Sequence, residues 1–158
     1  RSSDLIFHKT TLVTGTVPAG GLVFTGAIRD KLGGSDAEAG VIKTKYGLGV
    51  SKKQKEISDA VNPALQKIVK EIRRMVRYYE ERYGTEYPIG QIIMLGGGAN
   101  MPGLSDYLTA ELRLPVRAHD PWLHLKYDGL QAPSRPDQLM YDTVAGLSMT
   151  NPKEVFAS

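Results

Sequence analysis

The sequence predicts an α/β fold in which a mixed sheet is flanked by helices and carries an inserted helical subdomain. Short β-rich runs occur near both ends of the 158-residue chain, and between them apolar residues spaced by threes and fours span residues 54–83. A hydrophobic fraction of 41% with 23% charged residues is ordinary for a globular protein. We therefore expect the helical middle to be an excursion from a sheet.

The first elements are predicted as a hairpin followed by a helix. Residues 4–10 and 11–17 are β-rich and meet at a polar turn, and Pro18 ends the second run. Gly20 and Gly21 then precede apolar residues at helical spacing, which are Leu22, Val23, Ala27, Ile28 and Leu32.

A second, short helix is predicted directly afterwards. Ser35 and Asp36 supply its cap, Glu38 lies in its first turn, and Tyr46 with Gly47 ends it. The expected length is about three turns.

The pattern over residues 54–83 is that of an amphipathic helix, but it contains a proline. Pro63 would cost about 3 kcal/mol inside a continuous helix. Asn62 can instead cap a fresh helix with Pro63 at its first position, so we predict two helices that meet near Asn62. An aromatic stripe near the end is more typical of a core or an interface than of a stacking platform, and its members are Tyr78, Tyr79 and Tyr83.

The last third of the chain returns to strands. Residues 91–95 show no alternation of apolar and polar side chains, which predicts a strand buried on both faces. A helix from about residue 104 to 113, a strand at 115–118 and a final helix over 137–149 complete the prediction. We expect all four strands to form one mixed sheet, with the helical segments 36–46 and 54–83 to one side of it.

Composition excludes several classes of protein. No stretch approaches the roughly 20 apolar residues of a membrane span, and no leader opens the chain, so we expect a soluble, unsecreted protein. Without cysteine, the chain has no disulfide, thiolate metal site or catalytic thiol.

The net charge of the chain is +3. Nine basic and five acidic residues lie between Lys52 and Arg82, a distribution more typical of a solvated helix face than of a nucleic-acid site. Because an apolar strand begins almost at once without an initiator methionine, we expect a piece of a larger protein.

The sequence shows no known catalytic pattern. His8, His119 and His124 lack companions at metal-ligand spacing and are more typical of surface or loop histidines. Neither a Gly-x-Ser-x-Gly elbow nor a Walker A sequence occurs. The three glycines at 96–98 do not match Gly-x-Gly-x-x-Gly, because Met101 stands at the place of the third glycine.

The candidate ligand site that these exclusions leave is the glycine turn at residues 96–98. It follows an apolar strand, and Pro102, Gly103 and Leu104 then begin a helix. One interpretation is a tight turn with a structural role. The other is a ligand site, because a strand, a glycine turn and a helix N-terminus direct bare N–H groups at a polar or negative ligand.

The segment IIMLGGGANMPGLSDYLTAEL, residues 92–112, resembles the adenosine motif of the actin-like ATPases, a superfamily that includes actin, FtsA and PilM. VPAGGLVFTGAI resembles the strand end and glycine pair of subdomain 2A, and AEAGVIKTKYG resembles the helix whose lysine lies beside the ribose and adenine. The resemblance implies a ribonuclease H-like ATPase domain 2 that binds ATP, with Mg²⁺ in the full-length protein. It assigns ATP-binding roles to Gly20, Gly21, Lys43, Gly96, Gly97, Gly98, Ala99 and Pro102.

The resemblance also implies a division of the chain and an inactive fragment. Residues 1–34 and 89–158 would form subdomain 2A, and residues 35–88 the helical subdomain 2B. The phosphate loops and the acids that hold Mg²⁺ in the superfamily would precede residue 1, so we expect domain 2 alone, with no catalytic or metal-binding residue and no ATPase activity.

Two further segments narrow the resemblance to the PilM family of type IV pilus assembly. NPALQKIVKEIRRMVRYYEERYG and MYDTVAGLSM are similar to that family's long helix and closing helix. The implied protein is a cytoplasmic ATP-binding scaffold, peripheral to the inner membrane through its partners. Its implied partner is the cytoplasmic tail of a PilN-like protein, bound mainly by the other domain, with self-association as a further contact and neither nucleic-acid binding nor direct membrane insertion. The alternatives are an FtsA-like cell-division protein and a protein-interaction module without a nucleotide site.

Overall fold

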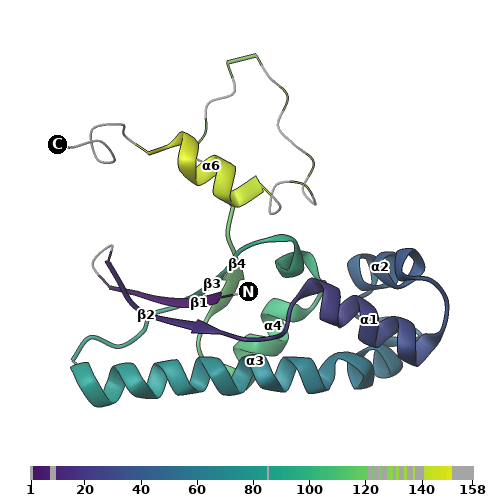
Figure 1. Ribbon diagram of the computed structural model, residues 1–158, viewed down its shortest axis with the longest axis horizontal. Helices are drawn as coiled ribbons and strands as arrows, with labels where there is room; N and C mark the ends of the chain where they lie inside the picture. The colour runs from purple at the N-terminus through teal and green to yellow at the C-terminus, as the bar shows by residue number, and fades with distance from the viewer. Residues whose placement is uncertain are drawn as a thin grey trace.

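The computed structural model describes residues 2–7, 10–84, 86–120, 122, 125, 128–129, 131, 134, 137 and 141–150. Figure 1 shows the arrangement of the elements. In chain order they are β1 (Ser2–Phe7), β2 (Thr10–Thr16), α1 (Gly21–Leu32), α2 (Asp36–Lys45), α3 (Gln54–Tyr83), β3 (Ile92–Met94), the 3-10 turn η1 (Gly97–Asn100), α4 (Leu104–Leu112), β4 (Val116–Ala118) and α6 (Asp142–Ser148).

The predicted hairpin is confirmed, and the predicted single sheet is wrong for the described residues. β1 and β2 pair antiparallel, from Ser2 opposite Thr16 to Phe7 opposite Thr10. β3 and β4 form a separate parallel pair, with Ile92 opposite Val116, and α4 makes the crossover that a parallel pair requires. Because no described strand bridges the two pairs, the described part of the chain holds two two-stranded sheets.

The predicted helix starts at α1 and α2 are confirmed, and α2 is fixed by its own side chains. Ser35 Oγ accepts a hydrogen bond from the Glu38 backbone N–H at 3.2 Å, and Glu38 Oε2 accepts one from the Ser35 backbone N–H at 2.8 Å. This reciprocal capping box satisfies two N–H groups that would otherwise lack partners. α1 follows Gly20, which has no side chain, so no side-chain hydrogen bond caps the first backbone N–H groups of this helix.

The predicted break at Asn62 is wrong, because α3 runs as one helix through Pro63. Asn62 does not cap a new helix; its Oδ1 accepts a hydrogen bond from the Tyr107 hydroxyl at 3.3 Å. Five residues on both sides of the proline are buried in one core, and they are Ile57, Val61, Ala64, Leu65 and Val69. Burial of a valine, leucine or isoleucine side chain contributes about 1.5–3 kcal/mol, so the four of these types together exceed the cost of the proline.

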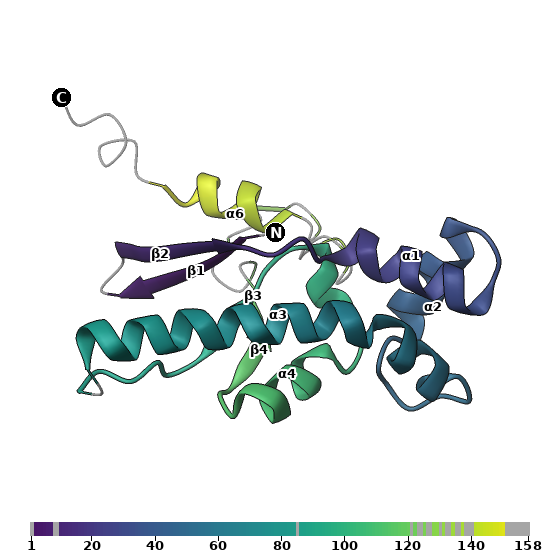
Figure 2. The same cartoon turned by 60° about the horizontal axis from the view of Figure 1, so that its bottom comes forward.

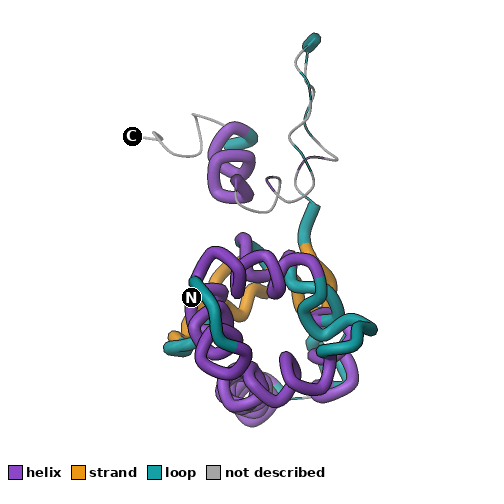
Figure 3. Tube along the Cα trace, turned by 90° about the vertical axis from the view of Figure 1, so that its right-hand side faces the viewer, coloured by secondary structure: helices purple, strands orange, loops and turns teal. Residues whose placement is uncertain are grey.

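The core lies among α1, α3 and α4, and α2 packs on α1. Figure 2 shows the hairpin above α3 and α4 below it, and Figure 3 views the helices from the α1–α2 end. β2 approaches α3 so closely at Gly15 that a Cβ there would lie 2.6 Å from Glu71 Oε1. α6 lies across the hairpin from α3 (Figures 1 and 2), within the predicted final helix, of which residues 138–140 lie outside the described ones.

The prediction that residues 91–95 form a strand buried on both faces is also wrong. Ile92 and Met94 pack against the core, whereas Ile93 is 43% exposed and Leu95 is 62% exposed. A strand in a two-stranded sheet that packs on the core with one face leaves its other face uncovered. Among the described helices, none is long and apolar enough to cross a membrane.

Candidate functional site

Two glycine segments that are distant in sequence lie close together in the fold. Gly21 begins α1, and Gly98 lies in η1 directly after β3. A Cβ built on Gly98 would lie 3.5 Å from the Gly21 backbone nitrogen, and one built on Gly21 would lie 3.7 Å from Gly98 Cα. The predicted site residues around Gly20–Gly21 and Gly96–Gly98 are therefore brought together. We call the approach of Gly21 to Gly98 the glycine junction.

Lys43 reaches the glycine junction from α2. Its Nζ donates hydrogen bonds to the Gly21 carbonyl oxygen at 3.1 Å and to Thr25 Oγ1 at 2.9 Å. Partial burial lowers the pKa of Lys43, because desolvation disfavours the charged ammonium. Within the described part of the chain no carboxylate pairs with this ammonium, so its charge is left for another anion or polar oxygen.

Unused backbone donors surround the same place. The N–H groups of Gly21, Leu22 and Val23 belong to the uncapped first turn of α1. Those of Gly97 and Gly98 have no hydrogen-bond partner among the described residues. Together with Lys43 they form an electropositive region of the kind that binds phosphate or polar oxygen at helix N-termini. Leu22 is 72% exposed, so an apolar surface lies next to these donors.

The structure gives three other predicted site residues roles within the turn. Gly96 has φ +84°, a conformation that glycine adopts without strain, and a Cβ there would meet no atom within 4 Å. The Ala99 N–H donates to the Gly96 carbonyl oxygen at 2.9 Å, so it is not available to a ligand. The Pro102 carbonyl oxygen accepts from the Leu48 N–H at 2.8 Å. Ala99 and Pro102 thus shape the turn and secure it to the rest of the fold.

A second close contact joins the turn to the loop between α2 and α3. Gly47 has φ +48°, and a Cβ there would lie 2.6 Å from the Pro102 carbonyl oxygen. Gly103 has φ +75°, and a Cβ there would lie 2.9 Å from the Leu48 carbonyl carbon. We call this contact of residues 47–49 with residues 101–103 the loop joint. It fixes the glycine turn relative to the helix that carries Lys43.

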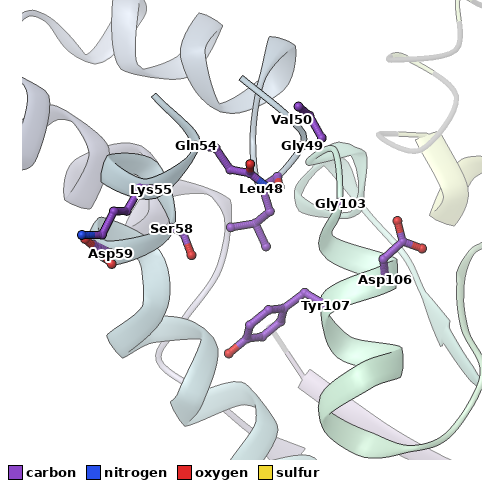
Figure 4. Close-up of a pocket in the computed structure, with 10 residues that line it drawn as sticks. All are labelled: Leu48, Gly49, Val50, Gln54, Lys55, Ser58, Asp59, Gly103, Asp106 and Tyr107. Carbon is purple, nitrogen blue, oxygen red and sulfur yellow. Dashed lines mark hydrogen bonds between the residues drawn. The ribbon is translucent and has the colours of Figure 1, made fainter. Parts of the chain in front are cut away.

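A solvent-exposed groove lies beyond the loop joint, not at the glycine junction. It has a volume of about 590 Å³ and is open to solvent between the start of α3 and the start of α4 (Figure 4). Its lining is Leu48, Gly49, Val50, Gln54, Lys55, Ser58, Asp59, Gly103, Asp106 and Tyr107. None of the eight predicted site residues lines it. We place the candidate site at the glycine junction because the free N–H donors and the unpaired lysine lie there.

Sequence reasoning missed two parts of this site. Thr25 holds the Lys43 ammonium, and no spacing rule links a threonine in one helix to a lysine in the next. The sequence predicts only a helix end at Tyr46 and Gly47, whereas the Gly47–Gly49 loop also contacts residues 101–103. No cluster of three or more His, Asp or Glu side chains that could hold a metal ion occurs in the described residues. The expected Mg²⁺ in the full-length protein stays a prediction.

Fold and site together define an α/β domain, mostly helical, with a small parallel sheet that ends in a glycine turn. The family model described as type IV pilus assembly protein PilM matches residues 3–151. The chain belongs to this PilM family. A search among curated proteins finds no match.

A solved structure with a similar fold was also found. The chain is similar to one in a structure described as a PilM-PilN type IV pilus biogenesis complex, with a TM-score of 0.73 and 24% identity. The similarity covers 94% of this chain and 41% of the other, so this chain spans less than half the length of that protein. At this identity the likeness supports the fold. The finer assignment to a ribonuclease H-like domain 2, and its division into subdomains, stay predictions.

Proposed function

We propose that this chain forms the adenosine side of an ATP-binding cleft in a scaffold of type IV pilus assembly. The observation that carries the proposal is the meeting of Gly21, Gly98 and Lys43, which come from three separate elements. The predicted ATP-binding residues are spread over more than 80 positions of the sequence, from Gly20 to Pro102. Gly21 nevertheless lies within hydrogen-bond distance of Lys43 and so near Gly98 that a Cβ on either glycine would contact the other.

The chemistry of the glycine junction suits an adenine nucleotide. Glycine at 21 and 98 lets a flat ligand lie against main chain that no side chain covers. The N-terminus of α1 adds up to about half a positive charge, and Lys43 adds a full charge without a paired acid. Exposed Leu22 and Val23 offer apolar contact for a base. In the proposed scaffold, Mg²⁺ and most phosphate contacts come from the other domain.

The proposed biological setting follows from the family. The similar solved structure is described as a PilM-PilN complex, which supports a PilN-like partner for this protein. We place the scaffold in the cytoplasm, held at the inner membrane by the cytoplasmic tail of that partner. Nucleotide binding between two domains would set the angle between them and so regulate assembly.

The first test is the substitution Gly98→Ala in the full-length protein, with binding of a fluorescent ATP analogue as the measurement. A Cβ at this position meets Gly21 at 3.5–3.8 Å, which is ordinary van der Waals contact, so the fold should tolerate it. A ligand lying on the main chain should not tolerate it. We expect affinity to fall at least tenfold, equivalent to about 1.4 kcal/mol, with little change in the melting temperature. Gly97→Ala is expected to act in the same direction.

Gly26→Ala is the matched control, because Gly26 also lies in α1 but a Cβ there meets nothing within 4 Å. It should leave ATP affinity unchanged. Unaltered affinity in Gly98→Ala, together with lost stability, would contradict the nucleotide site and leave the glycines with a structural role.

That outcome would favour the protein-interaction alternative. One observation supports it: of the aromatic stripe on α3, Tyr79 is buried and donates a hydrogen bond to the Tyr87 carbonyl oxygen, whereas Tyr78 and Tyr83 are exposed. Exposed aromatic side chains are common in protein interfaces. Tyr78→Ala combined with Tyr83→Ala should then weaken capture of a PilN-like cytoplasmic peptide without lowering the melting temperature.

A further inference from the structure

Thr25 has a buried polar side chain, with 9% of its surface exposed. Burying a hydroxyl is unfavourable unless it makes hydrogen bonds. Thr25 Oγ1 makes two, to the Gly21 carbonyl oxygen at 2.9 Å and to Lys43 Nζ at 2.9 Å. Both partners belong to the glycine junction, so this residue is part of the site's support.

The chemistry of the three groups fixes the direction of each hydrogen bond. An ammonium has donors but no acceptor, so Thr25 Oγ1 must accept from Lys43. The single hydroxyl hydrogen of Thr25 is then free to point at the Gly21 carbonyl oxygen. That oxygen also accepts directly from Lys43 Nζ at 3.1 Å. The result is a closed set of three hydrogen bonds.

This set determines what Lys43 has left to offer. The ammonium carries three N–H donors, and the Gly21 carbonyl and the Thr25 hydroxyl use two of them. A Cβ on Gly21 would lie 3.5 Å from Lys43 Nζ, so the nitrogen lies directly beside the glycine junction. The third donor can therefore serve one oxygen atom of a ligand there.

We infer that Thr25 is a positioning residue that holds the Lys43 ammonium at the glycine junction so that its third N–H serves one ligand oxygen. The inference rests on the proposed nucleotide site, whose ribose and phosphate oxygens are the acceptors of this class. A lysine has a flexible four-carbon stem, and threonine, branched at Cβ, is stiff at its first torsion. Fixing the ammonium before binding reduces the entropy lost when the ligand arrives.

The test uses the full-length protein with Thr25→Val, which keeps the shape and removes the hydroxyl, and Thr25→Ser, which keeps the hydroxyl. Thr150→Val is the control, because Thr150 Oγ1 also donates to a glycine carbonyl four residues earlier, that of Gly146 at 3.1 Å, without a lysine partner. The first measurement is hydrogen exchange of the Lys43 ammonium, followed by NMR without nucleotide. The second is the affinity for an ATP analogue.

We expect Thr25→Val to speed ammonium exchange and to weaken ATP affinity, each by about fivefold or more. Thr25→Ser and Thr150→Val should stay within twofold of the unaltered protein. In a Lys43→Met background, Thr25→Val should have no further effect on affinity. These results separate positioning from packing, because packing alone would not be rescued by serine or depend on the lysine.

Two outcomes overturn the inference: unchanged ammonium exchange in Thr25→Val, or equal affinity losses in the valine variant with and without Lys43. If Thr25→Val does not fold, fast Lys43 exchange in the unaltered protein, equal to that of an exposed lysine, overturns it as well. The exchange measurement needs no nucleotide. A protein that binds no ATP but shows a protected Lys43 ammonium that Thr25→Val releases would contradict the proposed function and support the positioning role.

Discussion

Gly98 and Gly103 lie five positions apart, yet they lack a side chain for different reasons. At Gly98 the fold leaves room for a Cβ, so the protein itself does not demand glycine. At Gly103 the backbone has φ +75°, and the Leu48 carbonyl carbon would lie 2.9 Å from a Cβ. The fold therefore requires glycine at the loop joint and only permits it at the glycine junction. This contrast makes Gly98 the better probe of a ligand.

Alanine at the loop joint should destabilise the protein strongly. Gly103→Ala and Gly47→Ala each add a Cβ that overlaps backbone atoms, at 2.9 Å and 2.6 Å, in a left-handed conformation. We expect each to lower the free energy of unfolding by about 2 kcal/mol or more, measured by urea denaturation.

Gly26→Ala and Gly40→Ala supply the comparison, since both positions are helical and open. Alanine there should be neutral or stabilising by up to about 1 kcal/mol. Equal free energies of unfolding for the loop-joint variants and the helix variants would contradict this prediction, because they would show that the loop joint accommodates a Cβ without loss of stability.

ATP affinity should depend on the protonation of Lys43. Burial lowers the pKa of Lys43, so in the folded protein the ammonium loses its proton at a lower pH than in the unfolded chain. Between those two pKa values the unfolded chain binds more protons, so this group makes stability rise with pH there. The ligand needs the charged form, so affinity should fall as pH rises through the lowered pKa.

The measurement is a titration of ATP-analogue binding against pH in the unaltered protein and in Lys43→Met. The methionine variant should bind more weakly at neutral pH and lose the alkaline decline. A decline of equal size in both proteins would assign it to another group.

Helix α3 shows how packing overrides a local preference. Pro63 has no N–H to donate to the Asp59 carbonyl, and its side chain is exposed, so the residue contributes no buried contact of its own. Pro63→Ala should restore the missing hydrogen bond and raise the free energy of unfolding by about 1–3 kcal/mol. Ala60→Gly in the same turn should lower it by about 1 kcal/mol. No gain from Pro63→Ala would mean that the helix has adapted fully to the proline.

Helix α2 buries only Ala39 fully, and its first turn is stabilised by the capping box. Ser35→Ala should lower the free energy of unfolding by about 1 kcal/mol. The Ser35 backbone N–H and hydroxyl, which both donate to the carboxylate, lower the pKa of Glu38. Its stabilising effect should be complete above the pKa of an unfolded glutamate and disappear as pH falls through the lowered value.

The capping prediction is checked by acid denaturation of the unaltered protein and Glu38→Gln. The two should differ most near neutral pH and converge in strong acid, where the glutamate is protonated in both states. A constant difference at all pH values would contradict the ionised capping box.

At the scale of the whole molecule, the proposed function makes the described residues one wall of a nucleotide-binding cleft. They contain the glycine junction but no cluster of acidic or histidine side chains for a metal ion. We therefore expect the 158-residue chain to release no phosphate from ATP above background in a steady-state assay. Its affinity for ATP should also be weaker than that of the full-length protein. Phosphate release that survives repeated purification would contradict this prediction.

Much of the fold could be predicted from local patterns. The hairpin, the starts of α1 and α2, the extent of α3 and the crossover helix α4 follow from residue periodicity, glycine and proline positions and one capping residue. The errors share a cause. The break at Asn62 and the double burial of residues 91–95 were inferred from local preference, whereas the outcome depended on which distant residues pack against those segments.

Some residues of the candidate site could likewise be predicted from the sequence, and others could not. Its glycines and Lys43 could be identified in the sequence, and the motif resemblance grouped them. Thr25 and the Gly47–Gly49 loop could not be, because their roles depend on contacts between helices that the sequence does not encode in any spacing.

The amino-acid order alone thus settles which residues can form helices, strands and tight turns, because those preferences depend on neighbours within a few positions. Family membership rests on the same linear pattern over residues 3–151. The tertiary structure determines three further features. Helix α3 is continuous, β3 exposes one face, and Gly21 lies beside both Gly98 and Lys43. These outcomes depend on long-range burial and hydrogen bonding, whose energies exceed the local preferences they overrule.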